Sequence, residues 1–180
     1  MTVAAFILGI IGTLTGCLSF GWGIAQFVLT GARPKLTPVV CILSGGKLYA
    51  MPATKNVRED IQGSLAHLGG KIVVGVEVVN AGRSPFHVIG WAWRTDPSGI
   101  AAVEKDPQGQ RPPCEVGAGA SKTFVTEPGG VVAAVKGSRA KGVEPRTVYA
   151  WVSSGGRDYK SRPLPPEIVT MLEEQSNDAP

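Results

Sequence analysis

Apolar residues are arranged in two different patterns along the chain. The first is a nearly unbroken apolar stretch from Val3 to Leu29, in a region that has no charged side chain before Arg33. As a helix it would be about 40 Å long, at about 1.5 Å per residue, which exceeds the roughly 30 Å hydrocarbon core of a bilayer. We therefore predict a transmembrane helix over residues 3–29, followed by a juxtamembrane segment over residues 30–35.

The second pattern is an alternation with a period of two, which is clearest over residues 71–80, KIVVGVEVVN. A face of four β-branched residues at this spacing is typical of a strand with one side in a core. That face comprises Ile72, Val74, Val76 and Val78. Turn residues follow from Asn80 to Pro85, so the next apolar run, residues 86–95, is expected to form a hairpin with this strand.

Shorter apolar runs bounded by Gly and Pro predict the remaining elements. Further strands are expected over residues 35–44, 47–51, 121–126, 146–154 and 158–162. Short helices are expected over residues 129–140 and after Pro165. Residues 52–69 are compatible with a loop or a helical turn, and residues 104–120 are interpreted as a long loop.

This series of short strands favours an all-β domain over residues 36–174, of the immunoglobulin-like β-sandwich type with one or two short helices. The tail over residues 175–180 is expected to be disordered. The whole chain is thus interpreted as an N-terminal transmembrane α-helix that carries one small β-sandwich.

The distribution of basic residues predicts the orientation. Arg33, Lys35 and Lys47 follow the span, the first acidic residue is Glu59, and no basic side chain precedes the span. Basic flanks stay on the cytoplasmic side, so we expect a single-pass plasma-membrane protein with its N-terminus outside and its domain in the cytoplasm. Arg33 and Lys35 are the predicted membrane-flanking residues. A cleaved signal peptide is disfavoured. The apolar run is longer than the roughly 7–15 residues of the apolar core of a signal peptide, and no basic region precedes it.

Small residues recur within the span. They stand at every fourth position from Ala5 to Ala25, and Gly12 and Gly16 add a GxxxG pattern. Small residues allow two transmembrane helices to approach closely, so they predict self-association. Because each step of four residues rotates the face by about 40°, only a central set can meet one partner. The predicted helix-association residues are Gly9, Gly12, Thr13, Gly16 and Cys17. A composition rich in Gly and Ala without any contact is the alternative.

Charge and cysteine content restrict the possible partners. The net charge is +4, from 18 Lys and Arg against 14 Asp and Glu, and the basic residues are scattered. We therefore expect no nucleic-acid binding. Cys41 and Cys114 would form one disulfide in an extracellular domain and stay reduced in a cytoplasmic one.

Candidate chemistry is sparse. His67 and His87 have no companions at metal-ligand spacing, and no catalytic constellation or phosphate-binding motif can be identified. Trp91 and Trp93 are expected to share a strand face with His87 and Ile89, and this face would form either an aromatic recognition surface or part of the core. We therefore predict a protein that is not an enzyme and has no cofactor, metal or catalytic residue.

One resemblance concerns most of the chain. The Gly-rich span, the stretch VEVVNAGRSPFHVIGWAW and the stretch VYAWVSSGGRDYKSRPLP resemble a group of single-span proteins of actinobacteria and their phages. The resemblance implies a host class and an architecture, and no activity.

The functional hypothesis is a membrane-anchored, non-catalytic binding or scaffold module. Its expected partners are the lipid bilayer, an unidentified protein, and a second copy through the transmembrane helix. The alternative is a ligand-binding receptor or an enzyme with a site in the 52–69 or 96–120 loops.

Overall fold

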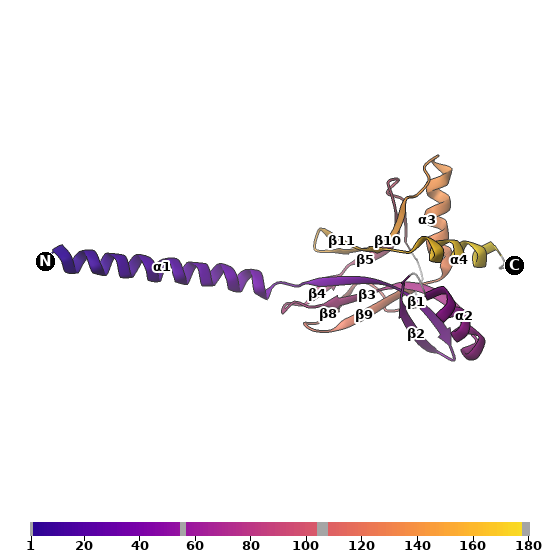
Figure 1. Cartoon of the computed structure of the whole chain (residues 1–180), viewed down its shortest axis with the longest axis horizontal. Coiled ribbons are helices and arrows are strands. Elements are labelled where there is room, and N and C mark those ends of the chain that lie inside the picture. The colour runs from indigo at the N-terminus through magenta and orange to yellow at the C-terminus, as the bar shows by residue number, and fades with distance from the viewer. Residues whose placement is uncertain (1, 55–56, 104–107, 178–180) are drawn as a thin grey trace.

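The computed structural model describes residues 2–54, 57–103 and 108–177 of the chain. A long N-terminal helix, α1 (Thr2–Thr30), extends away from a sheet-rich domain at its carboxyl end (Figure 1). Within the described ranges the domain has three further helices where one or two were expected. They are α2 (Val57–Leu68), α3 (Pro128–Ala140) and α4 (Pro166–Asn177).

Helix α2 occupies most of the 52–69 segment, so of the two alternatives for that segment the helical one is correct and the loop is wrong. Its buried residues Val57 and Ile61 are four positions apart and therefore lie on one helix face. Glu59 and Asp60 stand in its first turn, where the positive end of the helix favours acidic side chains.

Two larger antiparallel sheets form the body of the domain. The first has the strand order β2-β1-β3-β9-β7. Its strands are β1 (Pro34–Ser44), β2 (Lys47–Pro52), β3 (Lys71–Asn80), β7 (Gln108–Gly109) and β9 (Ser121–Thr126). The second has the order β11-β10-β5-β6. Its strands are β5 (Gly90–Asp96), β6 (Ala101–Ala102), β10 (Thr147–Ser154) and β11 (Arg157–Pro163). A separate pair joins β4 (Phe86–Val88) to β8 (Cys114–Val116).

The predicted hairpin between residues 71–80 and 86–95 is wrong. Strand β3 pairs with β1 and β9, whereas β5 pairs with β10 and β6. Both strands carry a strongly apolar face. The two faces contribute to one core between different sheets, so the strands are not hydrogen-bonded neighbours in one sheet. The turn residues after β3 therefore lead out of the first sheet to β4, and β5 of the second sheet follows β4. The prediction of a long loop over residues 104–120 also needs correction, since the described part of this segment contains the short strands β7 and β8.

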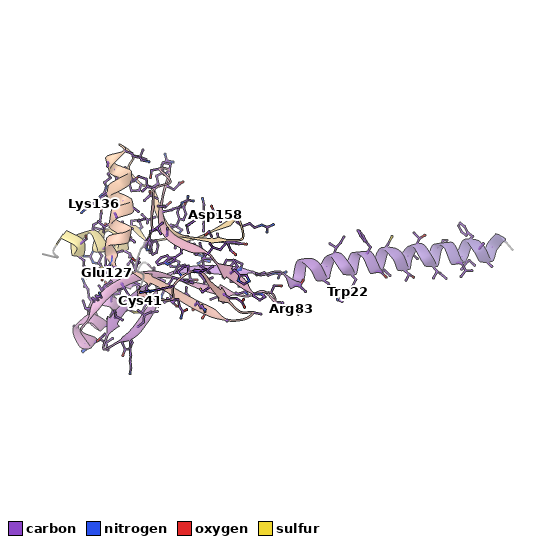
Figure 2. The ribbon with its side chains drawn as sticks, turned by 180° about the vertical axis from the view of Figure 1, so that it is seen from behind. Trp22, Cys41, Arg83, Glu127, Lys136 and Asp158 are labelled. Atoms are coloured by element: carbon purple, nitrogen blue, oxygen red, sulfur yellow. The ribbon has the colours of Figure 1, made fainter. Side chains whose placement is uncertain are left out.

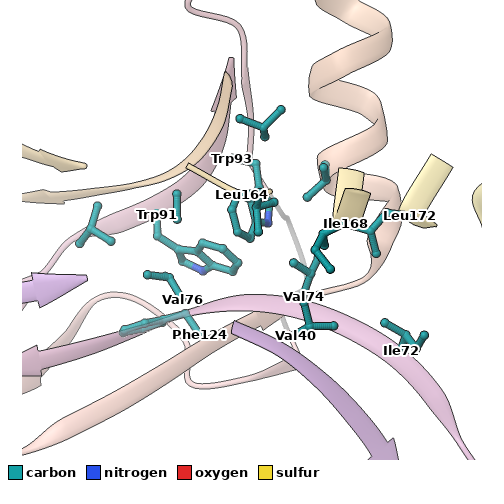
Figure 3. Packing of buried hydrophobic residues seen from close by; sticks show 14 of the residues in the cluster. Val40, Ile72, Val74, Val76, Trp91, Trp93, Phe124, Leu164, Ile168 and Leu172 are labelled. Carbon is teal, nitrogen blue, oxygen red and sulfur yellow. The ribbon is translucent and has the colours of Figure 1, made fainter. Parts of the chain in front are cut away.

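The predicted core face of β3 is confirmed. Val74, Val76 and Val78 are fully buried and Ile72 is 6% exposed. They pack in one cluster with the tryptophans of β5 and with Ile168 and Leu172 of α4 (Figure 3). A smaller cluster lies on the opposite face of the same sheet and contains Val39, Cys41, Val73 and Val125. The central strands of this sheet are thus buried on both faces.

The predicted boundaries shift at both ends of the domain. The first sheet begins at Pro34, inside the segment that was expected to be a separate juxtamembrane stretch. At the other end α4 continues to Asn177, so part of the tail expected to be disordered is helical, and residues 178–180 lie outside the described residues. Helix and sheet at the N-terminal end are therefore separated by residues 31–33 alone.

Candidate functional site

Helix α1 presents its apolar side chains outward. It is long and apolar enough to cross a membrane over Val3–Gln26, and none of its most apolar window is buried against the domain. Phe6 and Leu18, for example, are 69% and 75% exposed. A core helix of a soluble domain would hide such side chains, so this helix requires an apolar environment other than the described domain.

Two hydroxyl groups in the middle of α1 are hydrogen-bonded within the helix itself. The Thr13 hydroxyl donates to the Gly9 carbonyl at 2.9 Å, and the Thr15 hydroxyl donates to the Ile11 carbonyl at 2.8 Å. Such bonds to the carbonyl four residues earlier remove the cost of placing a hydroxyl in hydrocarbon.

The small-residue face of α1 is open. A Cβ added to Gly9, Gly12 or Gly16 would meet nothing within 4 Å, and a shallow groove beside Gly9 and Thr13 runs along this part of the helix. Cys17 on the same face is exposed. The described domain therefore leaves this face available to a second helix, and association through it stays a prediction.

The carboxyl end of α1 is joined to the domain by the buried side chain of Asn80. Its Oδ1 accepts hydrogen bonds from the backbone N–H of Arg33 at 3.2 Å and of Gly82 at 3.0 Å. Its Nδ2 donates to the carbonyls of Ser84, Val116 and Gly117, at 2.8, 3.1 and 3.3 Å. One amide thus connects the chain leaving the helix, the 80–85 turn and the end of β8.

Residues of the 80–85 turn also contact the helix end directly. The Ser84 hydroxyl donates to the Thr30 carbonyl, and the Ala81 N–H donates to the Arg33 carbonyl at 3.0 Å. Gly82 approaches so closely that a Cβ there would lie 2.2 Å from the Gly31 carbonyl oxygen. We call this set of contacts among residues 30–33 and 80–84 the junction. It leaves no free linker between helix and domain.

The predicted membrane-flanking residues lie at or next to the junction. Arg33 belongs to it through both backbone groups, and Lys35 is exposed in β1 opposite Val79. Asn80 and Gly82 were predicted as turn residues only, and their role at the helix end was missed. Turn composition signals a change of direction but carries no information about what lies against the turn.

A cavity of about 240 Å³ lies between β5, β6 and the first turn of α3. Its lining combines two indole rings with small side chains and glycines: Trp91, Ala92, Trp93, Ala102, Val103, Thr126, Gly129, Gly130 and Ala133. The Trp93 indole N–H has no hydrogen-bond partner in the described part of the chain, but it is shielded from solvent. The cavity therefore offers polar and apolar surface in similar amounts.

The tryptophan alternatives are decided in favour of the core. Trp91 and Trp93 are 5% and 1% exposed, and their rings meet edge to face at 6.1 Å between centroids. His87 and Ile89 do not share their face, since both are exposed. Phe86 and Val88 are buried at even positions, whereas Trp91 and Trp93 are buried at odd positions, so the alternation on which the prediction rested changes phase between β4 and β5.

No protein-family model, curated protein or solved structure matches this chain.

The remaining candidate residues lie apart from one another. His87 is 3.8 Å from Glu115, and nowhere in residues 2–54, 57–103 and 108–177 do three metal-ligating side chains gather. All three cysteines lie within these ranges and are free thiols. Cys41 belongs to the smaller cluster and Cys114 packs on the main core, so the two lie in separate clusters. Burial raises the pKa of the Cys41 thiol to about 12.

Proposed function

We propose that this protein is a membrane-anchored, non-catalytic binding or scaffold module that presents its domain at the surface of the plasma membrane. One observation carries the proposal: the exposed apolar helix α1 is hydrogen-bonded directly into the domain through Asn80. Such a helix inserted in a bilayer would hold the domain at the membrane in a fixed pose. The proposed architecture includes an immunoglobulin-like sandwich, on the ground that two antiparallel sheets enclose the main core.

The proposed topology is single-pass, with the N-terminus outside and the domain in the cytoplasm. Its support is the basic flank of Arg33, Lys35 and Lys47 after the span, with no basic side chain before it. The resemblance to single-span proteins of actinobacteria and their phages belongs to the same proposal.

Thiol labelling tests this topology, and the structure selects the reporter. Cys114 is half-buried, whereas Cys41 is fully buried and too weakly acidic to react readily. A variant with Cys17→Ala and Cys41→Ala keeps Cys114 as its single thiol. With a membrane-impermeant maleimide we expect labelling after lysis and none in intact cells.

The matched control carries Thr2→Cys as its single thiol, with all three native cysteines replaced by Ala, and should label in intact cells. The reverse pair of results would overturn the orientation. Extraction of the wild-type protein from membranes by alkaline carbonate would overturn the anchor itself.

An open sheet edge supports the binding role. Strand β2 is the outer strand of the first sheet, and Leu48 and Tyr49 on it are each 39% exposed. Exposed edge strands bind a partner strand through main-chain hydrogen bonds. Proteins cross-linked to the full chain in cells should be lost with Leu48→Lys/Tyr49→Lys. They should be retained with Val103→Lys, which alters an exposed position just after β6 of the second sheet.

The cavity lined by Trp91 and Trp93 favours a second candidate, a receptor for a small ligand. Ala102 and Val103 of its lining lie in the 96–120 segment, where the alternative site was expected. A small apolar ligand should raise the melting temperature of the full chain. Ala133→Leu, at the cavity, should abolish that effect, whereas Ala140→Leu, exposed at the end of the same helix, should preserve it.

A further inference from the structure

Basic side chains from separate segments gather at the end of the domain that faces α1. We call this set the membrane-proximal basic surface. It consists of Arg33, Lys35, Arg83, Lys122 and Arg157. Lys122 is half-buried, and the other four are exposed. From the sequence, only Arg33 and Lys35 are predicted to flank the membrane, since the other three basic residues lie far along the chain.

The contacts of neighbouring residues locate each of these side chains. Arg83 stands between Gly82 and Ser84, which both contact the end of α1, and Figure 2 shows it beside the helix end. Lys122 is opposite Val78, two residues before Asn80 of the junction. Arg157 opens β11 just after the tight turn that points back toward α1 (Figure 1).

The junction holds this surface at one depth. Arg33 comes three residues after Thr30, the last residue of α1, and the hydrogen bonds of Asn80 remove the slack that a linker would allow. With α1 in a bilayer, the five basic side chains would therefore lie at the level of the lipid headgroups.

Acidic side chains at this end are fewer than the five basic ones. They include Glu115, which is 3.8 Å from His87, Asp158, which is 3.9 Å from Arg94, and Glu77, which lies three residues before Asn80 in β3. Many other carboxylates lie on or beside the helices α2, α3 and α4, at the end of the domain far from α1 (Figure 1). They include Glu59, Asp60, Glu127, Glu144, Glu173 and Glu174.

We propose that the membrane-proximal basic surface binds anionic lipid headgroups of the bilayer that contains α1, and that this binding seats the domain on the membrane. The inference rests on the proposed function, because it requires α1 to span the bilayer. Each basic residue near an anionic membrane surface strengthens binding by about 5-fold, and salt screens the attraction.

Hydrogen exchange of the full chain in nanodiscs tests the proposal. Discs of phosphatidylcholine alone are compared with discs of phosphatidylcholine and phosphatidylglycerol in a two-to-one ratio. In the anionic discs we expect backbone amides near Arg83 and Arg157 to exchange about 5-fold more slowly. The turn at Gly45 and Gly46, at the far end of β1, should be unaffected.

The variants separate this surface from charge in general. Arg83→Gln/Arg157→Gln should remove the protection, and high salt should do the same. Lys47→Gln/Lys141→Gln, which alters two exposed lysines away from the surface, should retain it. Equal exchange of the wild type in both discs, or equal loss of protection in both double variants, would overturn the proposal.

Two further outcomes would separate a failure of the lipid assignment from a failure of the membrane anchor. Protection in neutral discs by soluble glycerol phosphate would overturn the assignment to bilayer lipid and indicate a free phosphate ligand. A chain that fails to enter either disc would overturn the anchor, and hence the proposed function on which this inference depends.

Discussion

The Cα of Gly82 faces the backbone of Gly31 so closely that a single methyl group would not fit between them. A Cβ on Gly82 would lie 2.2 Å from the Gly31 carbonyl oxygen and 2.5 Å from the Arg33 nitrogen. Both neighbours are backbone atoms, so neither can move aside as a flexible side chain could. This contact fixes where the chain leaves the helix.

Gly82→Ala is therefore expected to destabilise the full chain by about 1–3 kcal/mol, the usual cost of overpacking. The measurement is chemical unfolding in detergent micelles. The control is Gly63→Ala in the middle of α2, where a Cβ would meet nothing within 4 Å. That change should stabilise the domain by about 0.5–1 kcal/mol, since Gly is a poor helix former. Equal effects of the two substitutions would contradict the close approach.

Asn80→Ala should loosen the junction. It removes five hydrogen bonds and leaves buried backbone groups without partners, at an expected cost of about 2–4 kcal/mol. Amide exchange at Arg33 and Gly82 should accelerate, while exchange in the middle of β10 should change much less. Gln62→Ala removes an exposed amide on α2 and should leave exchange at the junction unchanged. Junction amides that stay protected in Asn80→Ala would mean that the backbone contacts suffice.

Val76→Asp should unfold the domain. Val76 is fully buried and lies opposite Phe124 in β9, so the aspartate would be an unpaired charge in the main core. We expect a loss of at least about 4 kcal/mol. Val103→Asp, at a position 67% exposed, is the matched control and should change the melting temperature little. A similar melting temperature for both variants would show that the core face of β3 is misplaced.

Stability should fall in alkaline solution because of Cys41. The folded domain holds the thiol proton until about pH 12, whereas the unfolded chain loses it near the ordinary value of 9.0. Above pH 9.0 the unfolded state thus binds fewer protons, and the free energy of unfolding decreases by up to about 1.4 kcal/mol per pH unit. Cys41→Ala should reduce this slope relative to wild type, and Val39→Ala, which truncates a side chain of the same cluster that does not titrate, should not. Unfolding free energies at about pH 8 and pH 10 measure it; parallel slopes for wild type and Cys41→Ala would refute it.

Gly12→Ile and Gly16→Ile should weaken association between copies of α1. A β-branched side chain at either position would separate helices that meet on the small-residue face. Leu14→Ile lies off that face and is the control. A membrane two-hybrid assay of residues 1–33 reports the contact directly. Equal signals for all constructs, or no signal for the wild type, would leave the small residues as composition alone.

Local sequence patterns predicted the elements whose cause is itself local. The helix over residues 3–29 follows from an unbroken apolar stretch, and the core face of β3 follows from periodicity. The helix after Pro165 follows from its first-turn residues, and its side chains Ile168, Met171 and Leu172 are buried. These predictions needed no knowledge of what each element packs against.

Non-local relationships could not be obtained in the same way. The alternation of apolar and polar residues predicts that β3 and β5 are strands, but it does not determine whether they share a sheet. The predicted hairpin between them was wrong. Likewise, NAGRSP predicts a turn whether it faces solvent or a helix end. Asn80 reveals its role only through burial, since a fully buried amide must find partners for all its polar atoms.

Because the junction joins helix and domain without a hinge, a change in the tilt of α1 would be transmitted to the far end of β1. The eleven residues of β1 extend about 36 Å from the helix end to the turn at Gly45, at about 3.3 Å per residue. With no hinge at Arg33, a change of about 10° in the tilt of α1 would move that turn by about 6 Å. Bilayer thickness, which sets helix tilt, would then govern which face of β2 a neighbouring protein can reach.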